Sequence, residues 1–155
     1  MDEEAFLDTN TLVYFAAADV DRAERVEELL LAGGIVSVQV LNELTLTCLR
    51  KLGMDWAEVD EVVAMVRTAC RVEPLTETTF DLGRQLAERY QFRIYDAMIV
   101  ASALEAGCTT LWSEDLHHGL VVAGQLRIRN PFRAYSVQEP HAREPTSRHA
   151  TKIKQ

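Results

Sequence analysis

The sequence has few cysteines and no long apolar run, and each shortage excludes a class of protein. Its three cysteines, Cys48, Cys70 and Cys108, lie far apart and form neither a CxxC pair nor a zinc-ligand spacing. We therefore expect buried free thiols and a reducing, cytoplasmic environment. No apolar run approaches the roughly 20 residues that a membrane span needs. The N-terminal "MDEEAFLD" lacks the basic and apolar regions of a signal peptide, so we expect neither an exported nor a membrane protein.

An excess of basic residues is also missing. The chain of 155 residues has 16 Lys and Arg against 24 Asp and Glu, which gives a formal net charge of −8. Proteins that bind nucleic acid through broad electrostatic attraction are usually basic. Any contact with nucleic acid must therefore be local, and a concentrated group of acids would need cations to offset its charge.

The sequence does contain an alternation of short strands and helices. Apolar runs predict strands at 5–7, 35–38, 71–76, 109–113 and 125–132, and helical patterns predict helices at 11–17, 19–34, 38–53, 55–70, 76–91 and 95–107. This order predicts an α/β protein, a three-layer α/β/α domain with a central parallel sheet of about five strands. We place this domain at 1–135. Residues 136–155 carry two prolines and little apolar periodicity, and we expect a tail that is disordered or ordered by a partner.

Four acids stand where an apolar residue would pack better or where a strand ends. Asp8 ends the first strand in "FLDTNTLVYF", and Asp115 follows a strand in "LWSEDL". Asp96 opens the most apolar helix, and Glu43 lies among apolar residues in "VLNEL". Each has an ordinary alternative: Asp8 and Asp96 are suited to cap helices, Asp115 to form a turn, and Glu43 to lie on a half-exposed helix face.

Taken together, these acids favour a metal site. Ligands bind at the carboxyl ends of the strands in a parallel sheet, and four carboxylates gathered there would repel one another. Burying a carboxylate is also costly unless something compensates for it. Mg²⁺ and Mn²⁺ prefer oxygen ligands, and Mg²⁺ is usually held by one or two carboxylates together with phosphate oxygens. The pattern therefore predicts a site for a hard divalent cation, and it leaves one or two ions open.

In this order and context the acids resemble those of PIN-domain nucleases, most of all the VapC-type toxins of toxin–antitoxin systems. The likeness is carried by "FLDTNTLVYF", "VLNEL", "YDAMIVASALEAGC", "LWSEDL" and "IRNPF", and it covers roughly Phe6 to Phe132. It implies an endoribonuclease that depends on Mg²⁺ or Mn²⁺ and leaves 5′-phosphate ends on RNA. It also implies a homodimer and a cognate antitoxin protein as partner.

The resemblance also suggests a role for each matched residue. Asp8 and Asp96 match direct metal ligands. Glu43 and Asp115 match acids that ligate a second ion, bind through water or orient the attacking water. The matched polar residues that orient these carboxylates are Thr9, Asn10 and Ser113.

Three other functions remain open. A phosphotransferase of the haloacid-dehalogenase type also begins on a strand ending in Asp, but it needs a second Asp two residues later, where this chain has Asn10. A non-catalytic PIN-like scaffold would be expected to have lost some of the acids, and all of them are present. An RNA-processing nuclease outside a toxin pair would share the whole pattern.

Several neighbours of the acids carry weaker signals. We expect Glu114 to point outward and Trp112 to pack in the core rather than to stack on a base. The pair His117 and His118 is expected to face solvent or RNA, because hard metals favour oxygen. Candidate phosphate contacts, for which a solvated surface is the commoner role, are Arg50, Lys51 and Arg93.

Overall fold

The computed structural model describes residues 4–133, which fold into helices packed around one sheet. The predicted boundary at residue 135 and the tail 136–155 lie outside the described residues. In chain order the elements are β1 (Ala5–Leu7), α1 (Thr9–Ala16), α2 (Val20–Leu31), β2 (Gly34–Ser37), α3 (Val38–Arg50), α4 (Trp56–Ala69), β3 (Cys70–Glu73), α5 (Glu77–Tyr90), α6 (Ile94–Glu105), β4 (Thr110–Trp112), β5 (Val121–Val122) and β6 (Leu126–Arg129).

The six strands form one sheet in the order β3-β2-β1-β4-β6-β5. All neighbouring pairs are parallel except β5 with β6, which is antiparallel. From β1 the chain moves outward through β2 to β3 and then returns to place β4 on the other side of β1. The strand order therefore reverses between β1 and β4, and in open α/β sheets such a switch point is where ligands bind.

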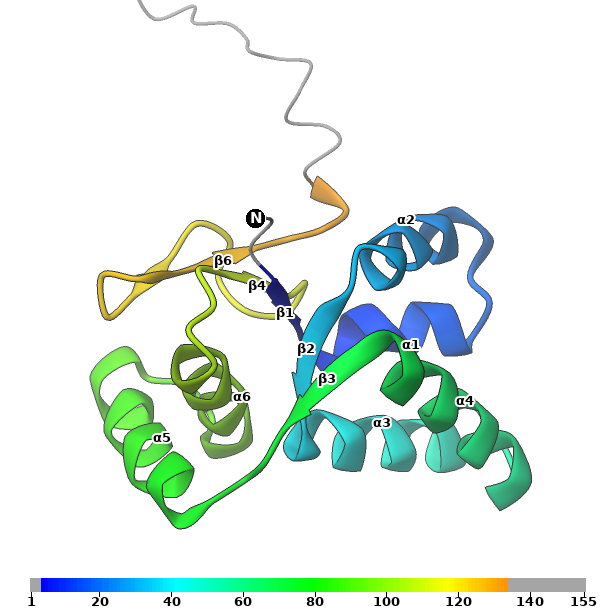
Figure 1. Ribbon diagram of the computed structural model, residues 1–155, viewed down its shortest axis with the longest axis horizontal. Helices are drawn as coiled ribbons and strands as arrows, with labels where there is room; N and C mark the ends of the chain where they lie inside the picture. The colour runs from blue at the N-terminus through cyan, green and yellow to red at the C-terminus, as the bar shows by residue number, and fades with distance from the viewer. Residues whose placement is uncertain (1–3, 134–155) are drawn as a thin grey trace, which may run out of the picture.

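Helices cover both faces of the sheet, as the predicted three-layer α/β/α architecture requires (Figure 1). The helices α5 and α6 pack together on one side, and α1, α2 and α4 lie on the other. The arrow of β2 points toward the start of α3, so the carboxyl ends of the strands face this helix. Among residues 4–133, no helix is both long and apolar enough to cross a bilayer.

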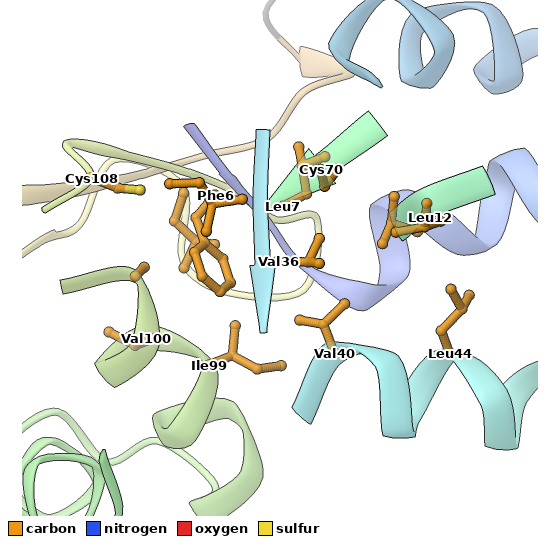
Figure 2. Close-up of a cluster of buried hydrophobic side chains, with 14 of the residues drawn as sticks. Phe6, Leu7, Leu12, Val36, Val40, Leu44, Cys70, Ile99, Val100 and Cys108 are labelled. Carbon is orange, nitrogen blue, oxygen red and sulfur yellow. The ribbon is translucent and has the colours of Figure 1, made fainter. Parts of the chain in front are cut away.

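The core forms because successive residues of β1 point to opposite faces of the sheet. Both Phe6 and Leu7 are buried. Figure 2 shows Phe6 on the side of Ile99 and Val100 from α6, while Leu12 of α1 lies across β2 from them. The three cysteines Cys48, Cys70 and Cys108 are buried in this core and form no disulfide with one another, so the prediction of buried thiols is confirmed.

Most element ends differ from the sequence prediction by one to three residues, and one strand was missed. Helix α1 begins at Thr9, two residues earlier than expected, because the carboxylate of Asp8 accepts a hydrogen bond from the Thr9 N–H and caps the helix. Strand β5 was not predicted. It pairs with β6 through a tight turn in which Ala123 and Gly124 have φ values of 51° and 67°. Positive φ at both central residues is typical of a type I′ hairpin. The strand was missed because two residues are too few to show a periodic pattern of apolar side chains.

The helix caps provide a direct test of the fold. Asp55 caps α4 in a complete capping box, in which its carboxylate binds the Glu58 N–H and the Glu58 side chain binds the Asp55 N–H. We predict that Asp55→Ala lowers the free energy of unfolding by about 1 kcal/mol. In urea denaturation the midpoint should fall, whereas exposed Asp60 on the same helix should tolerate Asp60→Ala. Equal midpoints for the two variants would contradict the capping geometry.

Candidate active site

Asp8 lies at the carboxyl end of β1, where the strand order reverses. Its backbone N–H donates to the Trp112 carbonyl of β4 at 3.0 Å, so the two central strands meet at this residue. Its side chain is 5% exposed and accepts two hydrogen bonds of 2.7 Å, from the Thr9 N–H and from the Ser113 hydroxyl. Asp8 therefore caps a helix, as the ordinary alternative requires, and it also presents a buried carboxylate at the sheet edge.

The pKa of Asp8 shows how costly this position is. Burial raises its pKa from 3.8 to about 7, although the hydrogen bonds from Ser113 and Thr9 act in the opposite direction. The charges of Asp96 and Glu43 raise it further. A buried carboxylate close to other carboxylates gains strongly from any cation that binds beside it.

Asp96 is the third residue of α6 and does not cap it. The cap position is Arg93, whose side chain makes no capping hydrogen bond, so the capping alternative is wrong for Asp96. The pKa of Asp96 is raised, first by burial and then by the charges of Glu43 and Asp115, while Arg93 lowers it. These shifts show that the predicted acids lie within electrostatic reach of one another.

Glu43 lies in the second turn of α3 and is held by two side chains. Its carboxylate accepts hydrogen bonds from the Thr9 hydroxyl at 3.1 Å and from the Gln39 amide at 2.9 Å. Thr9 thus contacts two of the acids, Asp8 through its N–H and Glu43 through its hydroxyl. The sequence analysis missed Gln39, although its i, i+4 spacing to Glu43 on a helix was a usable signal.

Asp115 lies in the exposed loop after β4. Its carboxylate accepts a hydrogen bond from the Asn10 amide. The hydroxyl of Ser113 accepts the Leu116 N–H at 3.2 Å while it donates to Asp8, which ties this loop to the end of β1. Each of the predicted supporting residues, Thr9, Asn10 and Ser113, therefore contacts at least one of the predicted acids.

Glu114 does not point outward, so that prediction is wrong. The side chain is half-buried and accepts a 2.5 Å hydrogen bond from the Tyr14 hydroxyl, which raises the pKa of Tyr14 to about 12. Arg22 lies 3.8 Å from the same carboxylate and over the rings of Tyr14 and Phe132. This group anchors the residue next to Asp115 to α1 and α2. Nothing in the local sequence pattern indicated it.

The weaker candidates separate clearly in the structure. Trp112 is half-buried and packs against the core, and the guanidinium groups of Arg25 and Arg129 lie over its ring at 5.2 and 5.1 Å. His118 accepts the Asn130 N–H at 2.9 Å through Nδ1, which is a structural role, and His117 is exposed. The predicted phosphate contacts, all exposed, are Arg50, Lys51 and Arg93.

The donor chemistry of the site suits a hard cation. Within residues 4–133, no three His, Cys, Asp or Glu side chains are gathered into a ready ligand group. A Mg²⁺ ion does not need one, because it keeps several waters and takes one or two carboxylates. The acids here offer oxygen only, and the raised pKa values of Asp8 and Asp96 show that a negative charge at this edge is costly without a cation. These residues therefore fit Mg²⁺ or Mn²⁺.

Comparison with known proteins identifies the fold family. Residues 5–121 match the family model of the PIN domain. The chain belongs to the PIN domain family. The match spans β1 to β5 and contains all the acids described above. None of the curated proteins matches this PIN domain significantly.

Several solved structures share this PIN fold. VapC20 of Mycobacterium tuberculosis, described as a toxin that cleaves the sarcin-ricin loop, has 20% identity and a TM-score of 0.61, covering 72% of this chain and 92% of its own. A toxin–antitoxin complex from Klebsiella pneumoniae has 15% identity and a TM-score of 0.62. The match covers 83% of this chain and 98% of that structure's chain. VapBC2 of Rickettsia felis, bound to a promoter DNA fragment, has 18% identity and a TM-score of 0.61. The match covers 81% of this chain and 97% of that structure's chain. At these identities the likeness shows the fold.

The raised pKa of Asp8 predicts an unusual pH dependence of stability. The Asp8 carboxyl ionises near pH 3.8 in the unfolded chain and near 7 in the folded PIN domain. Between these values the folded state binds a proton that the unfolded state lacks, so stability falls as pH rises from about 3.8 to about 7. From pH 5 to pH 8 the metal-free protein should lose roughly 2–3 kcal/mol of unfolding free energy through Asp8.

The variant Asp8→Asn isolates this contribution. Its amide oxygen still accepts from the Thr9 N–H and its amide group donates to the Ser113 hydroxyl, but no charge is buried. In urea denaturation with a chelator present, the variant should be more stable than wild type at pH 8 and should lose most of that advantage at pH 5. A constant difference between the two proteins across this range would contradict the burial of a titrating carboxylate.

Proposed function

We propose that this PIN domain is a metal-dependent endoribonuclease, the toxin of a toxin–antitoxin pair. One observation carries the proposal: Asp8 is a buried carboxylate at the switch point of the sheet, and Asp96 and Glu43 raise its pKa. Helix capping explains Asp8 alone, and the repulsion among the acids costs stability unless a cation is present. The likeness of the fold to solved VapC toxins supports the same activity.

In the proposed reaction Asp8 and Asp96 would hold a Mg²⁺ or Mn²⁺ ion. The chemistry that such an ion supplies when bound is polarisation of the scissile phosphate and activation of a water molecule. Ser113 and Thr9 keep the Asp8 carboxylate oriented, as residues behind metal ligands generally do. Glu43, whose carboxylate accepts hydrogen bonds from Thr9 and Gln39, would orient the attacking water or bind a second ion.

Asp115 completes the proposed site from the loop after β4. Asn10 fixes its carboxylate, while Tyr14 and Arg22 hold the neighbouring Glu114. Because Asp115 is exposed, it is the acid best placed to meet an incoming RNA strand or a second ion.

The partners follow from the same proposal. The neighbours from Klebsiella pneumoniae and Rickettsia felis are toxin–antitoxin complexes. By analogy we propose a cognate antitoxin, a homodimer and a cytoplasmic site of action on cellular RNA.

The activity is tested with purified, full-length protein freed of any partner. When the protein is incubated with total cellular RNA and Mg²⁺ or Mn²⁺, it should cleave the RNA, and a chelator should stop this cleavage. Asp8→Asn and Asp96→Asn should each lower the rate by at least about 100-fold, since even residues behind metal ligands typically contribute 10- to 100-fold. Exposed Asp60 lies on α4 and provides the matched control Asp60→Asn, which should cleave normally.

Two outcomes would contradict the nuclease proposal. A folded, metal-loaded protein that cleaves no RNA would favour a PIN scaffold that binds partners. Cleavage that persists in both aspartate variants would mean that the site lies elsewhere or that the preparation contains another nuclease.

Metal binding has its own readout in thermal unfolding. A ligand at 100 times its dissociation constant stabilises the native state by about 2.7 kcal/mol, which is roughly 5–10 °C for a chain of this size. Mg²⁺ should give such a shift at pH 8 and a smaller one at pH 5.5, where a proton competes for Asp8. Asp8→Asn should remove most of the shift, and Asp60→Asn should keep it. An equal shift in both variants would exclude Asp8 as a ligand.

A further inference from the structure

A second feature of this edge is a pocket of about 510 Å³ beside the acids. It lies between α3 and the first turn of α6 and is lined by Gln39, Asn42, Glu43, Thr45, Leu46 and Tyr95. Pockets that bind small ligands or single groups of larger ones typically measure about 300–1,000 Å³. The size of this pocket therefore suits a ligand group.

The pocket is continuous with the candidate active site. Glu43 lines the pocket and accepts a hydrogen bond from the Thr9 hydroxyl, and the Thr9 N–H donates to Asp8. Tyr95 immediately precedes Asp96 on α6. A molecule that fills the pocket therefore lies next to any group bound by the acids.

Tyr95 supplies an accessible aromatic surface in this pocket. The residue is 64% exposed, and its hydroxyl makes no hydrogen bond within residues 4–133. It differs in this from Trp112, whose ring lies under two guanidinium groups. Leu46, 46% exposed, adds an apolar side chain to the same lining.

The remaining lining is polar. Asn42 is exposed, and within the described part of the chain its amide makes no hydrogen bond, so both its donor and its acceptor are available. Gln39 is buried and donates to Glu43, which keeps that carboxylate on one wall of the pocket. An aromatic face combined with a free amide matches the faces and edges of a nucleobase.

We propose that this pocket binds an unpaired base of single-stranded RNA, next to the phosphate that is cleaved. Tyr95 stacks on the base, and the Asn42 amide hydrogen-bonds to its edge. Bases inside a duplex are already stacked and cannot enter, so the substrate is single-stranded at the cleavage site. This inference rests on the proposed nuclease function and assigns the base-binding residues beside its site.

The chemistry of the lining favours a base over a protein segment. A helix from a protein partner would bury an apolar stripe in an apolar groove. Here only Leu46 and Tyr95 are large apolar side chains, and they share the pocket with a carboxylate and two amides. Contact with a protein is therefore treated as an outcome of the test.

Binding is measured with full-length protein and a fluorescein-labelled single-stranded RNA of mixed sequence, with Ca²⁺ in place of Mg²⁺ to limit cleavage. Tyr95→Ala should weaken binding by about 5- to 100-fold, the effect of losing one base–aromatic stack. Tyr95→Phe keeps the ring and should bind as wild type does. Trp56 on α4 is also 64% exposed, so Trp56→Ala is the matched control and should have no effect.

Base recognition is tested with further probes. The same RNA annealed into a duplex should bind more weakly, and its affinity should not change in Tyr95→Ala. With single-stranded homopolymers, Asn42→Ala should reduce the differences in affinity among bases and should weaken the tightest complex by less than Tyr95→Ala does.

The outcomes separate the pocket from the nuclease proposal. Metal-dependent cleavage together with unchanged single-strand affinity in Tyr95→Ala would overturn the pocket and leave the nuclease standing. Binding that depends on Tyr95 in a protein that never cleaves would support the pocket and overturn the nuclease. Equal losses on single-stranded and duplex RNA would overturn base binding. Unchanged RNA affinity with a changed particle mass in light scattering would instead assign this face to contact between copies of the chain.

Discussion

Burial of Asp8 beside other carboxylates at the carboxyl edge of the sheet is the constraint on which the candidate site depends. Burial is the main cause of the raised pKa values of Asp8 and Asp96, and the charges of neighbouring acids raise both values further. Burial of such a group is tolerable only when hydrogen bonds compensate for lost water. Thr9 and Ser113 supply those bonds and come from both sides of the sheet's switch point. Their geometry therefore depends on the pairing of β1 with β4.

The topology explains how acids from distant parts of the sequence meet. Because β1 lies between β2 and β4, the carboxyl ends of three adjacent strands bring together Asp8, the helix that carries Glu43 and the loop that carries Asp115. Helix α6 packs against β2 and α3 and adds Asp96 from its first turn. No single segment contains the site, so its stability and its charge repulsion are properties of the whole fold.

Much of this arrangement was predictable, because its signals are local in sequence. The parallel sheet followed from the alternation of strands and helices, and the shared edge of the acids followed from the sheet. The anchoring of the Asp115 loop was not predictable in this way: the Tyr14 hydroxyl binds Glu114 from 100 residues away, and only tertiary packing creates the contact. Likewise β5 exists because β6 and a tight turn impose it. Contacts of this kind form only in the folded domain and leave no periodic pattern in the sequence.

For the proposed nuclease, the acidic charge of the chain limits how RNA could approach it. The net charge of −8 on the full chain gives no broad attraction for a polyanion, and repulsion is greatest at the acids themselves. In this proposal affinity comes from short-range contacts. These are a cation held by the carboxylates, exposed cationic side chains such as Arg93, and an uncharged surface that binds a base without repelling the phosphates. An uncharged ring beside the acids meets the last need. In the proposed site, Tyr95 directly precedes Asp96, so base binding and metal binding would share a single helical turn.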